Sequence, residues 1–135
     1  MGDLNLHSAV STLLRDHNRR GGYSFSLLCT ELGLPLASDG DGPDPEILSA
    51  VASLFDEVVL RAVRDLDLRS VEELTLLDPG RGRYVVRPLR AGETRLFLVV
   101  LMAPRLAWRR NLHLLCADLQ QYLARLDPEA PWRSR

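Results

Sequence analysis

The side chains that could carry catalysis are few in this sequence and are not grouped along it. The three histidines, His7, His17 and His113, have no carboxylate or thiol partner at the spacings that acid–base catalysis or metal binding uses. No serine lies in a nucleophile-elbow sequence, and no Ser/His/Asp or Cys/His set can be recognised. We therefore expect no catalytic residue, no cofactor and no metal site, and we predict that the chain is not an enzyme.

One glycine-rich loop carries three carboxylates, Asp39, Asp41 and Asp44. A hand-type calcium loop needs a ligand at its fifth position and a glutamate at its twelfth, and Pro43 and Ala50 occupy those positions here. We interpret the segment as a solvated loop in which Asp44 caps the helix that follows.

The clearest polar and aromatic cluster consists of Arg105, Trp108, Arg109 and Arg110. Such a cluster could bind an acidic partner or nucleic acid through charge and stacking. Arginine at the start of a helix opposes the helix dipole, which favours a role in binding over a role in helix stability. Exposed loop arginines without any function are the alternative reading, and the residues alone leave both open.

The composition is that of a globular protein of one domain. The chain has 135 residues, 46% of them hydrophobic, and a formal net charge of −1, so nothing draws the whole molecule to nucleic acid. Cys29 and Cys116 show no metal spacing and are expected as buried free thiols in a reducing compartment. No apolar run is long enough to span a bilayer and no signal segment is recognised, so we expect a cytoplasmic protein without membrane insertion.

The run Arg95–Ala103 predicts the central strand of a sheet, because it is apolar on both of its alternating faces. One face would carry Leu96, Leu98, Val100 and Met102, and the other Phe97, Val99, Leu101 and Ala103. Each face needs a cover of its own, which the helices before and after this run must supply.

The remaining elements follow from apolar spacing and turn residues. Pro35 places the strand Leu34–Ala37 at a sheet edge, and Pro88 indicates that Tyr84–Leu89 is not a central strand. Val71–Leu77 mixes charged and apolar residues and is likewise not expected at the centre. The other predicted elements are a first helix with an apolar stripe from Leu6 to His17, a strand Phe25–Thr30, and a last helix with a stripe from Leu112 to Leu126.

A long middle helix, Pro45–Leu66, has an apolar arc that covers about half of its circumference, wider than one buried face needs. The predicted core stripe is Ile47, Val51, Leu54, Phe55, Val58 and Ala62. The predicted additional flank is Leu48, Ala52, Val59, Val63 and Leu66. We expect a second subunit to cover this flank.

Together these elements predict a single α/β domain with three α/β/α layers and the order αββαβββα. A five-stranded, mostly antiparallel sheet would have the long helix on one face and the two terminal helices on the other. The core is expected at residues 4–126, and residues 127–135 are expected to form a frayed tail.

With that order in place, the chain resembles the roadblock/dynein light chain family, in particular its bacterial members that regulate Ras-like GTPases in gliding motility. The matching stretches are Ser26–Ser38, whose end reads Gly-Leu-Pro-Leu-Ala-Ser, and Arg95–Ala103 leading into Asn111–Leu126. Thr30-Glu31 stands where the family often has an acidic pair. Because the last predicted helix ends close to Arg135, we expect no C-terminal extension like that of some bacterial members. The resemblance implies a homodimer in which the middle helix and third strand meet their copies, and a surface that docks a small Ras-like GTPase.

The predicted site residues combine this resemblance with the helical pattern. For the dimer interface they are Leu48, Ala52, Val59, Val63, Val71, Glu73 and Thr75. For partner binding they are Ser49, Ser53, Asp56, Leu60, Arg105, Trp108 and Arg109. The leading hypothesis is a non-catalytic homodimeric regulator of a GTPase. The alternatives are a structural adaptor indifferent to nucleotide and, less favoured, a small-molecule-sensing domain.

Overall fold

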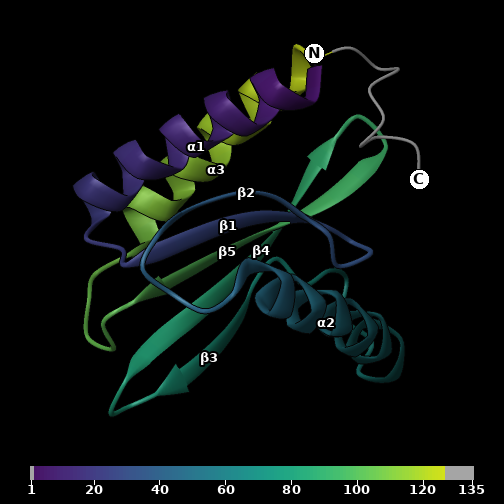
Figure 1. Cartoon of the computed structure of the whole chain (residues 1–135). Coiled ribbons are helices and arrows are strands. Elements are labelled where there is room, and N and C mark those ends of the chain that lie inside the picture. Colours follow the sequence, from purple (N-terminus) through teal and green to yellow (C-terminus); the bar gives the residue numbers. More distant parts are fainter. Residues whose placement is uncertain (1, 127–135) are drawn as a thin grey trace.

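The computed structural model describes residues 2–126, with side chains from Leu6 onward (Figure 1). The predicted order of three helices and five strands is confirmed. The tail predicted for residues 127–135 lies outside the described residues. The elements are α1 (Gly2–Gly21), β1 (Phe25–Thr30), β2 (Pro35–Gly40), α2 (Pro45–Asp65), β3 (Leu74–Asp78), β4 (Gly82–Ala91), β5 (Thr94–Met102) and α3 (Arg109–Ala124).

The five strands form one sheet in the order β2-β1-β5-β4-β3, and every neighbouring pair is antiparallel. β5 lies at the centre, as its uninterrupted apolar run predicts. Val99, in the middle of β5, stands opposite Leu27 of β1 on one side and Val86 of β4 on the other. β2 lies at one edge, as predicted from Pro35.

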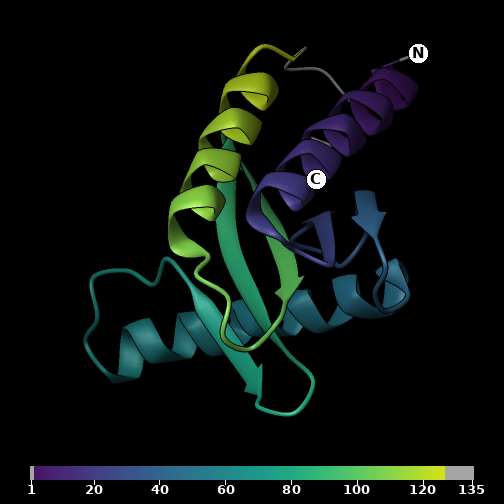
Figure 2. The same ribbon diagram turned by 90° about the vertical axis from the view of Figure 1, so that its left-hand side faces the viewer.

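Helices cover both faces of the sheet, α1 and α3 on one side and α2 on the other (Figures 1 and 2). Alternation along β5 divides the core in two, as predicted. Leu96, Leu98, Val100 and Met102 pack with residues of α1 and α3, whereas Phe97, Val99 and Leu101 pack with residues of α2. Full burial of such a side chain contributes roughly 1.5–3 kcal/mol, so the central strand holds both halves of the core together.

β4 is not the central strand, as predicted from Pro88, but it is an interior strand with a neighbour on each side. β3 pairs only with Gly82–Val86, so the second half of β4 has a strand neighbour on the β5 side alone. The backbone N–H of Arg90 donates to Oε1 of Gln120 on α3, at 3.0 Å, and so points away from β5. Pro88 lies two residues earlier, on the same side, where its missing N–H costs no ladder hydrogen bond.

The face that α2 turns to the sheet corrects one prediction. Leu48 and Ala52, expected on the outer flank, are buried against the sheet, while Ile47, Leu54 and Val58, expected in the core, are exposed. The two stripes lie about a quarter of a turn apart, because each helical residue advances by roughly 100°. The start of the helix is as predicted, since the Asp44 side chain accepts a hydrogen bond from the Glu46 backbone N–H at 2.9 Å.

Two polar contacts tie the paired helices together and to the chain between them. His17, buried on α1, contacts Asp118 of α3, with 2.8 Å between Nε2 and Oδ2. The Tyr23 hydroxyl, just after α1, donates to the backbone carbonyl of Trp108, just before α3, at 3.0 Å. Within residues 2–126, none of the helices is both long enough and apolar enough to cross a bilayer.

Candidate functional site

The most prominent surface feature is an apolar area on the outer side of α2 that continues onto β3. Ile47, Leu54 and Val58 are 62%, 59% and 55% exposed, which is unusual for three large apolar side chains on one helix stripe. We call this surface the α2–β3 face and define it as Ile47, Val51, Leu54 and Val58 of α2 with Leu76 of β3.

A groove of about 230 Å³ runs along this face between α2 and the strands β3 and β4. Ile47, Val51, Leu76 and Tyr84 line its rim, and buried core residues such as Val99 form its floor. Small-molecule sites have a few polar groups that fix the orientation of the ligand, and this lining is almost wholly apolar. The groove is therefore better suited to apolar side chains of a protein partner.

The backbone of β3 adds a second component to the same surface. Among the described strands, β3 pairs with β4 alone, so its other edge presents unpaired N–H and C=O groups. Leu76 lies on the α2 side of this edge, opposite Tyr84. An open strand edge next to an apolar helix stripe is a surface that pairs well with another chain.

The residues predicted for the dimer interface do not lie together on this face. Leu48 and Ala52 belong to the chain's own core, which corrects their placement, and Val59 and Val63 are half-buried. β3 begins at Leu74, so Val71 and Glu73 precede it rather than lying in it. Thr75 is exposed on β3.

Glu73, also predicted for the dimer interface, binds two arginines of its own chain. Its carboxylate lies 3.9 Å from Nη1 of Arg87 and 3.3 Å from Nη1 of Arg109. Only about a fifth of the Glu73 side chain is exposed. These contacts connect the segment before β3 with β4 and with the start of α3.

Three of the four α2 residues predicted for partner binding are also engaged within the chain. Ser49 is buried, the Asp56 carboxylate pairs with Arg95 of β5, and the Ser53 hydroxyl donates to the Ala50 carbonyl at 2.7 Å. Leu60 alone remains well exposed on that side of the helix. Residues at these spacings share a helix side, but the spacing does not reveal that this side faces β1 and β5.

The predicted arginine and tryptophan cluster is split by burial. Trp108 is only 7% exposed, so its indole ring can position neighbouring side chains but offers little surface to a partner. The guanidinium group of Arg109 lies over this ring, 4.3 Å from its centroid, and that of Arg83 lies 5.9 Å from it. Arg105 is exposed and makes no ion pair within the described part of the chain.

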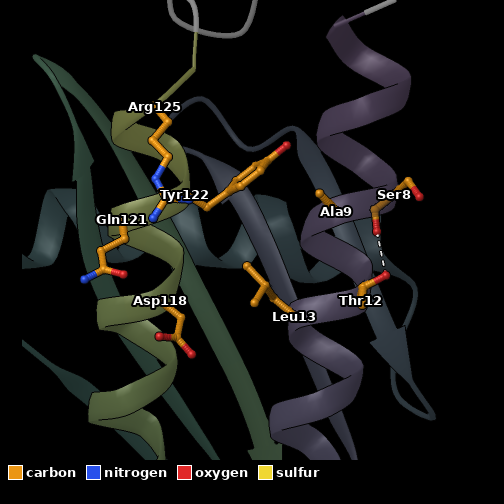
Figure 3. Close-up of a pocket in the computed structure, with 8 residues that line it drawn as sticks. All are labelled: Ser8, Ala9, Thr12, Leu13, Asp118, Gln121, Tyr122 and Arg125. Atoms are coloured by element: carbon orange, nitrogen blue, oxygen red, sulfur yellow. Dashed lines mark hydrogen bonds between the residues drawn. The ribbon is translucent and has the colours of Figure 1, made fainter.

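A second groove, of about 640 Å³, runs between α1 and α3 (Figure 3). Figure 3 shows Ser8 and Thr12 on one helix and Asp118, Gln121 and Tyr122 on the other, with the Thr12 hydroxyl donating to the Ser8 carbonyl at 3.0 Å. That hydrogen bond lies within α1 and points to no ligand. Asp118 is the only carboxylate among the described residues of this lining, which therefore supply no pair of carboxylates for acid–base catalysis.

His17 has an acidic partner that sequence spacing could not reveal, since Asp118 lies far from it in sequence. The ring of His17 is buried to 99%, however, so it cannot reach a substrate. In the described residues, no three histidine, cysteine or carboxylate side chains are grouped as a metal site would require. We interpret the His17–Asp118 contact as a structural link between α1 and α3.

Both cysteines are buried free thiols, as predicted, and their surroundings imply low reactivity. Burial raises the pKa of Cys29 from 9.0 to about 12, against an opposing effect of Ser49, and raises that of Cys116 to about 11. Because the thiolate is the reactive form, we expect a thiol reagent to label neither cysteine quickly at pH 8 in the folded protein.

Chemical labelling before and after unfolding in urea tests this expectation, with two fast-reacting thiols expected only in urea. Rapid labelling of Cys29 in the native protein would contradict its burial.

The same pKa shifts predict a pH dependence of stability. The folded protein binds the thiol protons more tightly than the unfolded chain does, because their pKa is raised on folding. The contribution of these thiols to the free energy of unfolding is therefore fully present below pH 9 and is lost as pH rises toward about 12.

Neither a protein-family model nor a curated protein matches this sequence, but solved structures match the fold. Myxococcus xanthus MglB has a TM-score of 0.76 at 12% identity, covering 87% of this chain and 97% of that one. A roadblock/LC7 domain from Streptomyces avermitilis has a TM-score of 0.70 at 20% identity, covering 84% and 96%. An MglB described with a tetrameric arrangement has a TM-score of 0.71 at 18% identity, covering 88% of both chains.

These likenesses establish the fold. The chain has the roadblock architecture, with the order αββαβββα and an antiparallel sheet of five strands, and it is similar to MglB proteins of the bacterial gliding-motility type. The predicted fold class and the resemblance are confirmed at this level.

Two groups of surface residues were not predicted from the sequence. One depends on the orientation of α2, and the other depends on the topology of the sheet. Helical spacing alone does not distinguish the outer stripe of α2 from the inner one, because both are apolar. The small residues Ser49 and Ala52 were the available signal, since they allow a helix to approach a sheet closely. Arg87 and His113 join Arg109 only through the fold, and no sequence spacing connects them.

Proposed function

We propose that this chain is a non-catalytic, homodimeric regulator that binds a small Ras-like GTPase and changes its nucleotide state or its location. The observation that carries the proposal is the α2–β3 face, an exposed apolar helix stripe beside an open strand edge. The roadblock fold and the resemblance of the sequence to gliding-motility regulators support the same reading.

In the proposed dimer, α2 and β3 of one protomer meet the same elements of its partner around a two-fold axis. Each exposed side chain of the stripe would then be removed from water by its own copy, as in an isologous interface. This placement replaces the predicted interface residues Leu48 and Ala52 by Leu54 and Val58, their exposed neighbours on α2. Leu60 lies on another side of α2, away from this seam, and stays accessible there for a partner of the dimer.

The reasons for proposing an absence of catalysis are geometric. His17 is buried, Asp118 of the groove between α1 and α3 is in contact with it, and both thiols are protonated at neutral pH. A regulator acts through a binding surface, so it needs none of these groups. We place the protein in the cytoplasm, because a reducing compartment keeps Cys29 and Cys116 as free thiols.

Affinity capture from a lysate of the source organism tests the function. We expect the tagged protein to retain a small GTPase with either GDP or a non-hydrolysable GTP analogue, but not equally with both. A Val58→Asp bait serves as the control, because a partner that recognises the dimer should be lost from a monomeric bait. Equal retention in both nucleotide states, or capture of larger proteins without a GTPase, would favour the structural adaptor instead.

A further inference from the structure

A groove with a positively charged lining lies at the start of α3, on the opposite side of the sheet from the α2–β3 face. It has a volume of about 510 Å³. We call it the basic groove; its lining residues are Arg87 of β4 and Arg109, Arg110, His113 and Leu114 of α3.

The end of β3 explains why this groove is open. β3 pairs with β4 only as far as Val86, so the next residue, Arg87, has no strand neighbour on that side. Arg87 shares its sheet face with Val85 and Leu89, which pack under α1 and α3. The first turns of α3 therefore face Arg87 across a gap that no strand fills.

Positive charge in the groove exceeds the negative charge available to balance it. Among the described residues, Glu73 is the one carboxylate that pairs with the lining, and it is shared between Arg87 at 3.9 Å and Arg109 at 3.3 Å. Arg110 forms no ion pair within residues 2–126. Arg87 and Arg109 thus share one carboxylate, and Arg110 adds a third positive charge to the groove.

The start of α3 adds to this imbalance. Trp108 stands at the N-cap position without a side-chain hydrogen bond to the helix, and the first turn contains no acidic residue. A cation in the first turn of a helix is unfavourable by about 0.3–1 kcal/mol, and this helix begins with Arg109 and Arg110. Local choices that oppose stability in this way are expected where binding, rather than folding, determines the residue.

Arg109 is also held in position before any partner arrives. Its guanidinium group rests 4.3 Å from the centre of the buried Trp108 ring, and yet 75% of its side chain remains exposed. A side chain that is already ordered loses less conformational entropy on binding. The planar guanidinium can then bind a carboxylate through two hydrogen bonds.

We propose that the basic groove binds an acidic segment of a protein partner, with carboxylates on Arg87, Arg109 and Arg110 and an apolar side chain against Leu114. Leu114 is 47% exposed at the groove and supplies the apolar contact. Nucleic acid fits less well, because single strands stack on exposed aromatic rings and Trp108 is covered by Arg109. The net charge of −1 gives the whole molecule no attraction to a long polyanion either.

The site lies on the sheet face opposite α2, so its occupation does not require the proposed function to be correct.

The experiment measures binding of a fluorescein-labelled peptide with the repeat Glu-Glu-Leu by anisotropy, at low and at physiological salt. We expect binding to weaken as salt rises and to weaken by about tenfold or more in Arg109→Glu/Arg110→Glu, because two attractive charges become repulsive.

The matched control is Arg19→Glu/Arg20→Glu, which changes the same charge in an adjacent pair at the end of α1. It should bind the peptide like the wild type. Arg110→Glu alone is a second test that leaves the Arg109 contacts with Glu73 and Trp108 in place, and we expect it to lose a smaller part of the affinity. Far-UV circular dichroism verifies that each variant is folded.

Four results would overturn the proposal. These are no binding up to about millimolar peptide, equal loss in the two arginine pairs, equal binding of a Gln-Gln-Leu peptide, and tighter binding of a single-stranded oligonucleotide than of the acidic peptide. The groove variant should still form a dimer and retain the GTPase. Failure of the basic groove is therefore distinguishable from failure of the proposed function.

Discussion

Val58→Asp should convert the protein from a dimer into a monomer, seen by light scattering after size exclusion as half the mass. Val58 is 55% exposed in the single chain, so the aspartate is solvated in the monomer and the fold should persist. In the proposed dimer the same carboxylate would be buried against the apolar stripe of the partner subunit without a counter-charge. We expect the dissociation constant to rise by roughly a hundredfold or more, which corresponds to about 3 kcal/mol.

The control for this experiment is Leu32→Asp. Leu32 is at least as exposed as Val58 but lies in the turn between β1 and β2, so the same charge is added away from the α2–β3 face. It should remain a dimer. A Val58→Asp protein with unchanged mass would show that this stripe is not the seam. Val59→Asp, the natural choice from sequence, would not test the seam, because Val59 lines a crevice against Phe97 in its own chain.

Leu48→Ala and Leu54→Ala should differ strongly in their effect on stability, although they are the same substitution on the same helix. Leu48 is 8% exposed and packs in the core beneath α2, so its truncation leaves a cavity and should cost about 2–4 kcal/mol of unfolding free energy. Leu54 is exposed, and its truncation should change the free energy by no more than about 0.5 kcal/mol.

Urea unfolding followed by circular dichroism measures both values. The pair is best compared in the Val58→Asp background, because dimer formation would otherwise add a concentration-dependent contribution to stability. Helix propensity changes equally in both variants, so it does not contribute to the difference. A larger loss for Leu54→Ala than for Leu48→Ala would mean that α2 turns its other stripe to the sheet.

The sheet and its layers were predictable because their signals are local and unambiguous. Only a strand buried on both faces explains the run from Arg95 to Ala103, and its two faces divide the core as alternation requires. Asp44 and Pro45 likewise fix the start of α2 through capping chemistry. These features depend on residues that are neighbours in sequence.

The orientation of α2 was not predictable in the same way, since both of its stripes are apolar and the periodicity is the same for each. Which stripe faces inward depends on the sheet beneath it, where Leu48 and Ala52 pack in one core cluster with Phe97. The apolar periodicity of the sequence also could not predict contacts between residues that are distant in sequence. Glu73 with Arg109, and His17 with Asp118, exist only because the topology brings their elements together.

The two halves of β4 have a consequence for how far copies of this chain can associate. Pro88 and the Gln120 side chain leave the second half of β4 without a free strand edge. At the β2 edge, the carbonyl groups of Leu36 and Asp39 already contact His7 and Asn18 of α1. Of the described strands, only the five residues of β3 can accept a strand from another copy. Two copies joined there consume both such edges, so growth by strand addition ends at a closed pair and does not continue into a fibre.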